Sequence, residues 1–349
     1  MPEFYKLYDY AADGLKRALP TAKIGGPNVA GTGGGGGSAF LKGFIEHCIS
    51  DTNYVTGKIG SPLDIILFHA KGAPRVVNGS VLMNMGTQLR DIEAGFKIAK
   101  SYPQTKNLPI IIGESDPEGC AACGMQTNPE NAYRNGTMFS SYTAASFARE
   151  YLLADEYEVN FKGAVSWSFE FEDQPWFYGF RDLATNGVDK PVLNVFRMFG
   201  MMKGNRVATT GTQMYPLKTL RDSSVRKLSD IGSLATKNKN AAYVLVWNYH
   251  DEDQQDTSTK VQLQINGLPY SQVKITEYRI DETHSNSYTL WKKMGSPQKP
   301  TVAQIVELEK AGMLQTVSNN RMIGAKNGKT DFTISLPRQA VSLFKMEWK

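Results

Sequence analysis

Apolar runs with the length of β-strands alternate with helical patterns over the first 205 residues of the chain. Strands this apolar, separated by helices, are typical of a parallel sheet that is covered on both faces or closed into a barrel. The predicted strands are residues 22–27, 63–72, 108–115 and 162–173, and the predicted helices are residues 4–19, 39–49, 89–102, 140–157 and 190–203. The fold class predicted for this part is therefore α/β.

The pattern changes near residue 205. Short strands with alternating polarity then follow one another, separated by turn residues, which is typical of an antiparallel sandwich. The predicted strands are residues 242–249, 260–265, 274–280, 332–337 and 342–348, and one helical segment, 301–313, interrupts them. The 349 residues exceed one ordinary core,. We predict two domains, 1–205 and 206–349.

Charge and hydropathy exclude two classes of partner. The net charge is +5, but Lys and Arg are scattered and form no basic cluster interleaved with aromatic residues, so we expect no nucleic-acid partner,. No run approaches the roughly 18 apolar residues of a membrane span, so we expect no membrane partner.

Polar residues stand where the predicted strands of the first domain end. The carboxyl ends of parallel strands meet on one face of the sheet, where binding sites form. Glu114 is the most informative, because a carboxylate that leaves a buried strand is costly unless it is paired or functional. The others are His69, Lys71, Ser115, Trp167, Glu170, Glu172 and Asp173. A structural His, a core Trp and a solvated acidic loop are the competing interpretations.

Aromatic and acidic residues occur together in the segment after the fourth predicted strand. Trp167 and Trp176 flank Glu170, Glu172 and Asp173. Aromatic faces stack on pyranose rings, and carboxylates accept hydrogen bonds from sugar hydroxyls. The segment therefore indicates a sugar-binding site.

Four segments together resemble a known family. They are residues 68–72 (FHAKG), 110–120 (IIIGESDPEGC), 164–200 and 278–297, which contains THSNSY. These segments resemble the β-xylosidase branch of glycoside hydrolase family 39, and the resemblance runs nearly the whole length of the chain. It implies a (β/α)8 barrel, a TIM barrel, followed by a β-sandwich, and hydrolysis with retention of anomeric configuration.

The same resemblance implies roles for individual residues. Glu114 matches the nucleophile at the end of barrel strand seven, and His69 matches a substrate-binding His after strand six. Trp167 matches the Trp after strand eight, while Glu172 and Asp173 stand near an acidic pair that contacts sugar hydroxyls. Lys71, also a candidate substrate-binding residue, replaces an aromatic residue of the family.

The acid/base carboxyl group of a retaining glycosidase is missing from this pattern. Retaining hydrolysis needs two carboxyl groups about 5 Å apart. In related families the acid/base Glu follows strand four in an Asn-Glu-Pro motif, which does not occur in this sequence. Glu3 opens a helix, and Glu130 has its Pro on the wrong side.

The strand count leads to the same expectation. A complete barrel has eight strands and about 250 residues, whereas four strands are predicted here. We expect this chain to carry only the C-terminal half of the barrel, about strands five to eight, before the sandwich. The cellular compartment then does not follow from this sequence, because a signal region would lie in the missing part. A periplasmic or secreted location would fit such a signal region.

Two other features have competing interpretations. Cys120 and Cys123 fit a loop that packs under the active site and can be cross-linked, a metal half-site, a redox pair, or a nucleophilic pair of Cys120 with His69,. The glycine tract 31–38 fits a flexible loop before a helix capped by Ser38, or a phosphate-binding loop without its usual Lys-Ser/Thr ending,.

The function predicted from these features is that of a retaining glycosidase. It would release β-linked xylose, or a similar pentose, from the non-reducing end of xylo-oligosaccharides in carbohydrate catabolism. The alternative is a non-catalytic carbohydrate-binding remnant. We expect no metal and no cofactor, because two carboxyl groups suffice for the reaction. The oligomeric state does not follow from the sequence.

Overall fold

The computed structural model describes residues 1–168, 173–253 and 258–348. The α/β class predicted from the sequence is confirmed. The chain divides into two compact units. Unit 1 comprises Met1–Ala73, Met85–Gly119 and Arg149–Trp167, and unit 2 comprises Pro74–Asn84, Cys120–Ala148 and Ser168–Lys349. The domain boundary at residue 205 stays a prediction.

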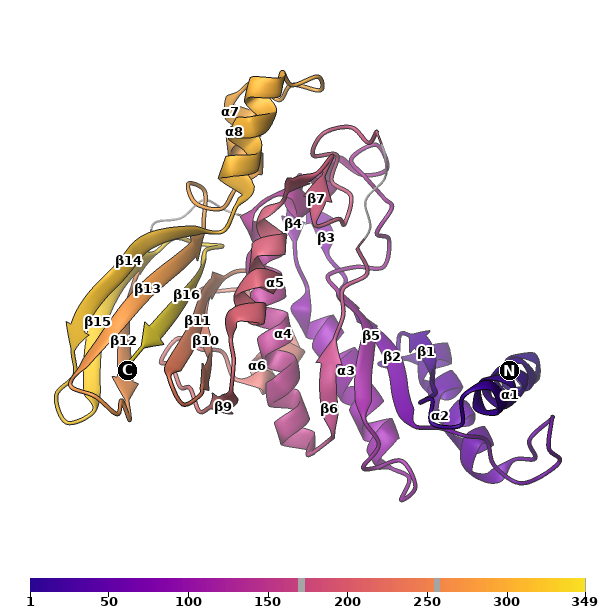
Figure 1. Cartoon of the computed structure of the whole chain (residues 1–349). Helices are drawn as coiled ribbons and strands as arrows, with labels where there is room; N and C mark the ends of the chain where they lie inside the picture. Colours follow the sequence, from indigo (N-terminus) through magenta and orange to yellow (C-terminus); the bar gives the residue numbers. More distant parts are fainter. Residues whose placement is uncertain (169–172, 254–257, 349) are drawn as a thin grey trace. The chain divides into compact units, whose positions relative to one another are not determined.

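Unit 1 is built on a parallel sheet of four strands in the order β1-β2-β5-β6 (Figure 1). The strands are β1 (Gly25–Ala30), β2 (Ile65–Lys71), β5 (Ile110–Asp116) and β6 (Phe161–Ala164). Its helices are α1 (Pro2–Ala18), α2 (Gly35–Ser50), α3 (Met85–Lys100) and the end of α4 (Thr137–Tyr157). The strands of this sheet lie side by side in the order in which they follow one another along the chain. Each connection that contains a helix therefore joins two adjacent parallel strands.

Hydrophobic spacing explains how the first helices pack. Tyr5, Tyr8 and Ala12 lie on one face of α1 and form a buried cluster with Phe44 and Cys48 of α2,. These positions repeat at three, four and seven residues, which is the spacing of one helix face. The apolar pattern of the two segments therefore dictates their contact.

The start of α2 differs from the prediction. The helix begins at Gly35 with Gly34 as its N-cap, so the prediction of Ser38 as N-cap was wrong. The reason is close packing. Gly33 N–H donates to Asp91 Oδ1 over 2.9 Å, and a Cβ at Gly37 would lie 2.2 Å from the Ala30 carbonyl oxygen. Gly37 is thus required by its close contact with the end of β1, while Gly33 ties the start of the helix to Asp91 of α3.

The fourth strand is shorter than predicted. β6 ends at Ala164, although the sequence predicts a strand over 162–173. The following residue still pairs with β5, because Val165 N–H donates to Ile112 O and Val165 O accepts from Ser115 N–H. Glu170 and Glu172 lie outside the described residues.

Antiparallel sheets dominate unit 2, as the sequence after residue 205 predicts. A six-stranded sheet has the order β14-β13-β16-β11-β10-β9, and β12 pairs with β15. The strands are β9 (Asn205–Val207), β10 (Asp230–Lys237), β11 (Ala241–Tyr249), β12 (Thr259–Asn266), β13 (Gln272–Ile280), β14 (Gln315–Gly324), β15 (Lys329–Leu336) and β16 (Val341–Glu347). Val261 and Phe332 of the small sheet pack against the core of the large one.

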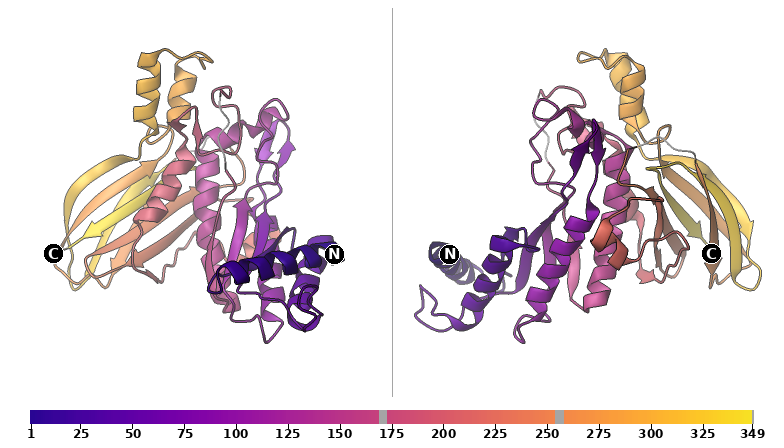
Figure 2. Two further views of the ribbon diagram at one scale, coloured as in Figure 1. Left: turned by 45° about the vertical axis from the view of Figure 1, so that its right-hand side comes forward. Right: turned by 180° about the vertical axis from the view of Figure 1, so that it is seen from behind.

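The remaining elements of unit 2 are short. Its helices are η1 (Pro129–Asn135), the start of α4, α5 (Pro191–Met201), α6 (Leu217–Ser223), α7 (Ser287–Lys293) and α8 (Val302–Gly312), and its two-stranded ribbons are β3 (Arg75–Val77) with β4 (Ser80–Leu82) and β7 (Ala184–Thr185) with β8 (Val188–Asp189). The predicted helix 301–313 is confirmed as α8, which a Thr301–Gln304 capping box begins,. α7 and α8 lie side by side (Figure 2).

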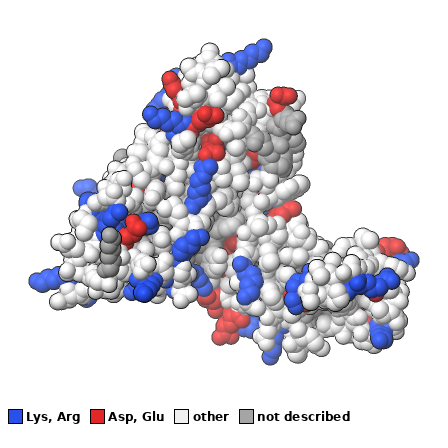
Figure 3. Space-filling view, viewed as in Figure 1, with Lys and Arg blue, Asp and Glu red and all other residues white. Residues whose placement is uncertain are grey.

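Charged residues of both signs are mixed on one face of the molecule. On the face shown in Figure 3, Lys and Arg are interspersed with Asp and Glu and with uncharged residues. Among the described residues, no helix combines the length and the hydrophobicity needed to cross a membrane.

Candidate active site

Four polar residues share one face of the sheet of unit 1. His69 pairs with Glu114 and Lys71 pairs with Asp116 across the β2–β5 ladder. Alternate residues of a strand point to the same face, so the two pairs lie together and Ser115 points to the other face. The sequence prediction that His69, Lys71 and Glu114 meet at the strand ends is therefore realised in the structure.

A bulge sets this register. Phe68 pairs with Ile112 and the next residue, His69, pairs with Glu114, which leaves Gly113 as the extra residue of β5. A Cβ at Gly113 would lie 2.0 Å from Asn28 Oδ1, so a side chain at this position would displace the Asn28 side chain. Bulges re-aim side chains and are frequent beside active sites. Here the bulge places Glu114 directly opposite His69 in the ladder.

Glu114 lies between a lysine and a histidine. Its Oε2 is 2.6 Å from Lys71 Nζ, and its Oε1 is 3.5 Å from His69 Nδ1. The side chains of Glu114, Lys71 and His69 are 20%, 14% and 16% exposed. A carboxylate held by a cation and still open to solvent is oriented and also accessible to a ligand.

His69 is arranged as a neutral imidazole. Burial, aided by the positive charge of Lys71, lowers the pKa of His69, although Glu114 acts in the opposite direction. Nε2 is buried and has no hydrogen-bond partner among the residues that the structure describes. A neutral ring with one nitrogen still to be satisfied can donate to, or accept from, a sugar hydroxyl.

Trp167 offers an aromatic surface in the same unit. Its side chain is 51% exposed. Its backbone N–H donates to Asp116 Oδ2 over 3.4 Å, and Ser166 Oγ donates to Asp116 Oδ1 over 2.5 Å. The segment after β6 is thus tied to the strand that carries Glu114.

The opposite face of β5 carries a buried polar network. Ser115 Oγ donates to Glu150 Oε1 and accepts from Gln88 Nε2. Burial raises the pKa of Glu150 to about 8. Glu150, Gln88 and Asp116 are not among the site residues predicted from the sequence. Glu150 gives little signal, because it stands in a helical segment that mixes apolar residues with Ser, Thr and other charged residues.

Replacing Glu150 by Gln is expected to reduce the pH dependence of stability. The folded state keeps a proton on Glu150 between pH 4.5, the ordinary value, and about 8, whereas the unfolded chain releases it. The wild-type free energy of unfolding therefore falls across this range. Gln mimics the protonated acid, so the variant should gain at least about 1 kcal/mol over wild type between pH 5 and pH 8.

Urea denaturation at the two pH values measures this difference. Glu158→Gln is the control, because the Glu158 side chain is 84% exposed and its replacement should change the difference little. Equal pH dependence in wild type and Glu150→Gln would show that Glu150 is ionised in the folded state.

Two predicted site residues are not part of this cluster as described. Glu172 lies outside the described residues. Asp173 is exposed, belongs to unit 2 and has a positive φ of 51°. Their predicted contacts with sugar hydroxyls stay predictions.

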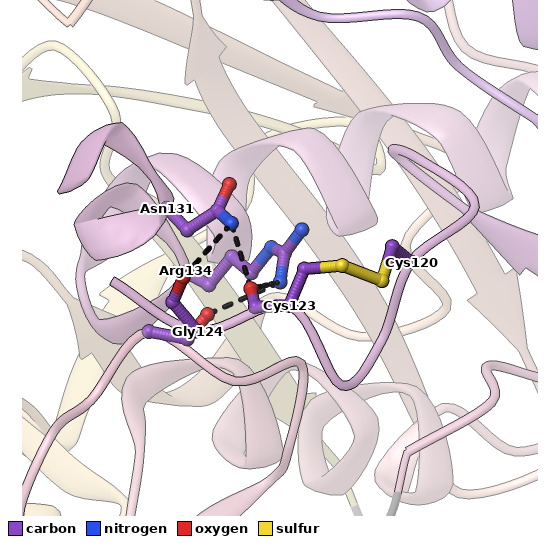
Figure 4. Close-up of a disulfide and its surroundings, with 6 residues drawn as sticks. Cys120, Cys123, Gly124, Asn131 and Arg134 are labelled. Atoms are coloured by element: carbon purple, nitrogen blue, oxygen red, sulfur yellow. Dashed lines mark hydrogen bonds between the residues drawn. A yellow bond between two sulfur atoms is a disulfide. The ribbon is translucent and has the colours of Figure 1, made fainter. Parts of the chain in front are cut away.

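The paired cysteines of unit 2 form a disulfide (Figure 4). The Cα atoms of Cys120 and Cys123 are 5.4 Å apart. Cys123 O accepts hydrogen bonds from Asn131 Nδ2 over 2.6 Å and from Arg134 Nη1 over 2.8 Å, which fix the loop to η1. The cross-linked loop is thus the interpretation that the structure supports.

The disulfide leaves no thiolate at Cys120, so a Cys120–His69 nucleophilic pair does not fit this state. Cys48 is the third cysteine, and burial raises the pKa of its thiol to about 12, which makes it a poor nucleophile,. No group of three or more His, Cys, Asp or Glu residues suited to a metal ion occurs within the described part of the chain.

Comparisons with known proteins identify a family for the chain. The model of the family Glycosyl hydrolases family 39 matches residues 1–320. The chain is 24% identical to α-L-iduronidase of Mus musculus over 335 residues, which are 86% of this chain and 48% of that protein. It is 23% identical to a β-xylosidase of Caldicellulosiruptor saccharolyticus over 354 residues, an alignment that covers 98% of this chain and 63% of that protein.

A solved structure shows the same fold. The match to a monomeric β-xylosidase from Caulobacter crescentus CB15 has a TM-score of 0.72 at 16% identity, and it covers 99% of this chain and 65% of that one. The chain thus spans less than two thirds of the length of each of these three proteins.

Proposed function

Because the chain belongs to family 39 of the glycosyl hydrolases, we propose that it acts on glycosides by a retaining mechanism with Glu114 as the nucleophile. The observation that carries the proposal is the position of Glu114. It stands at the end of a buried strand, is held by Lys71 over 2.6 Å and is still 20% exposed. A fixed and accessible carboxylate is what attack on an anomeric carbon requires.

The neighbouring residues fit sugar binding. His69 offers a neutral imidazole to a hydroxyl group, and the half-exposed Trp167 offers a surface on which a pyranose ring can stack. The first substrate that we propose is a β-xyloside, cleaved at its non-reducing end. The resemblance of residues 164–200 to β-xylosidases and the similarity to the Caldicellulosiruptor enzyme support it.

Lys71 favours a second candidate, a glycoside of a uronic acid. A pentopyranose carries no substituent at C5, whereas a uronic acid carries a carboxylate there. Lys71 places a cation 2.6 Å from the nucleophile, where such a carboxylate can form a charge-assisted hydrogen bond,. One of the relatives is an α-L-iduronidase, an enzyme named for a uronic acid substrate.

The fold supports an architecture for this function. We propose that the sheet of unit 1 forms part of a (β/α)8 barrel, namely about strands five to eight, and that the antiparallel sheets of unit 2 form an accessory β-sandwich. Asn-Glu-Pro is absent from the 349 residues. The proposal assigns the acid/base role to no residue of this chain.

A panel of aryl glycosides tests the proposal. Activated β-xylosides, α-L-arabinosides and α-L-iduronides are suitable, because good leaving groups depart with little need of a general acid. We expect turnover of at least one of them, and NMR of the first product should show the same anomeric configuration as the substrate. An inverted product would contradict the role of Glu114.

The same panel separates the catalytic reading from a carbohydrate-binding remnant. A remnant would keep His69 and Trp167 and bind sugars without releasing a product. Calorimetry that shows binding of xylobiose or a uronic acid disaccharide, combined with no turnover of any aryl glycoside, would favour the remnant.

A further inference from the structure

Asp116 connects three segments of unit 1. Its Oδ2 lies 2.5 Å from Lys71 Nζ of β2, and its Oδ1 accepts from Ser166 Oγ after β6 over 2.5 Å. Its backbone O accepts from Gly72 N–H over 3.0 Å. Asp116 itself lies on β5, two residues after Glu114. One residue thus links the strand of Glu114 to the lysine beside it and to the segment that carries Trp167.

The burial of Asp116 makes these contacts strong. Its side chain is 0% exposed. A buried carboxylate is costly unless hydrogen bonds and an opposite charge compensate it. Lys71, Ser166 and the Trp167 N–H supply that compensation. Asp116 and its partners therefore hold each other in a single arrangement.

The position of Lys71 depends on this arrangement. Lys71 Nζ contacts Glu114 on one side and Asp116 on the other, at 2.6 and 2.5 Å. A lysine side chain has several rotatable bonds and loses much entropy when it is fixed. The cation lies beside Glu114 because a second, fully buried carboxylate anchors it there.

We propose that Asp116 is a positioning residue for the glycosidase reaction, which fixes Lys71 against Glu114 and fixes the Trp167 segment through Ser166. The inference rests on the proposed function. Asp116 does not take part in the chemistry itself, because its side chain is fully buried and its oxygens are engaged by protein groups. Its two contacts have different effects. The contact with Lys71 positions the nucleophile Glu114, and the contact with Ser166 positions Trp167 for sugar binding.

Asp116→Asn tests the contact of Asp116 with Lys71. The amide keeps the shape but loses the charge, so Lys71 becomes more mobile and Glu114 is held less firmly. We expect kcat on an activated aryl glycoside to fall about 10- to 100-fold, with a small change in KM. Acetylation of Lys71 by an amine-reactive ester, followed by peptide mass spectrometry, should speed up several-fold.

Ser166→Ala tests the contact of Asp116 with Ser166 and serves as the matched control for Asp116→Asn. It removes the hydrogen bond to Oδ1 and leaves the contact of Asp116 with Lys71 in place. We expect KM to rise with kcat nearly constant, and the acetylation rate of Lys71 to stay at the wild-type value. Lys218, whose side chain is 81% exposed, is the internal reference for acetylation in every variant.

Three results would overturn the inference. They are an unchanged acetylation rate of Lys71 in Asp116→Asn, an unchanged kcat in that variant, and a Ser166→Ala variant whose KM stays constant. If Asp116→Asn does not fold, the KM of Ser166→Ala tests the inference: an increase supports it and a constant value overturns it. If the wild-type protein hydrolyses no glycoside, the proposed function fails, and the acetylation rates still show whether Asp116 fixes Lys71.

Discussion

Replacing Glu114 by Gln is expected to reduce kcat/KM for an activated aryl glycoside by about 10⁴-fold or more, because the reaction loses its nucleophile. The amide has nearly the same shape as the carboxylate but a neutral and poorly nucleophilic oxygen. The variant should fold, since its side chain remains partly exposed at the strand end. Steady-state kinetics on the substrate that the wild type turns over fastest measures the effect.

Glu3→Gln is the control for this experiment. Glu3 is an exposed residue in the first turn of α1, where its charge needs no role beyond the helix dipole,. Its replacement should leave kcat/KM unchanged. A Glu114→Gln variant with more than a few per cent of wild-type activity would show that another residue is the nucleophile.

Replacing Lys71 by Met is expected to have the second largest effect, on stability as well as activity. The change removes the cation between Glu114 and Asp116 and leaves the buried Asp116 with hydrogen bonds but without its opposite charge. Breaking a buried pair by removing one partner costs about 3 kcal/mol or more. The misplaced nucleophile should also lower kcat/KM by about 100-fold.

Lys97→Met controls for the loss of a surface lysine in the same unit. Lys97 pairs with Glu93 over 2.7 Å, but its side chain is 58% exposed. Screened pairs of this kind contribute under about 1 kcal/mol. Equal losses of unfolding free energy in the two variants, measured by urea denaturation, would show that the Glu114–Lys71–Asp116 cluster is as solvated as the surface.

Part of the site follows from the sequence by simple rules. The apolar runs 63–72 and 108–115 each end in polar residues, and the convergence of parallel strands is enough to bring His69, Lys71 and Glu114 together. Period-two alternation also puts Asp116 on the face of Glu114. Pro117 and Gly119 follow, however, and the predicted strand 108–115 therefore ends before Asp116.

The rest depends on contacts between distant segments. The bulge at Gly113 sets the register of β5 against β2, and the glycine leaves room for the Asn28 side chain, which lies two strands away in the sheet. The contact between Ser115 and Glu150 joins a strand to a helix 35 residues later. The helix around Glu150 is buried on several sides, so its periodicity does not indicate which residue faces β5. The contact of Gly33, just before α2, with Asp91 is likewise distant in sequence.

The most direct test of the account is to trap the covalent intermediate. Attack of Glu114 on the anomeric carbon of a 2,4-dinitrophenyl 2-deoxy-2-fluoroglycoside releases dinitrophenolate and forms a glycosyl ester, which the fluorine makes slow to hydrolyse. The sugar should be that of the best aryl substrate. We expect a single adduct on the peptide that contains Glu114, found by mass spectrometry after digestion. An adduct on another carboxylate, or continued turnover of the substrate with no adduct, would contradict it.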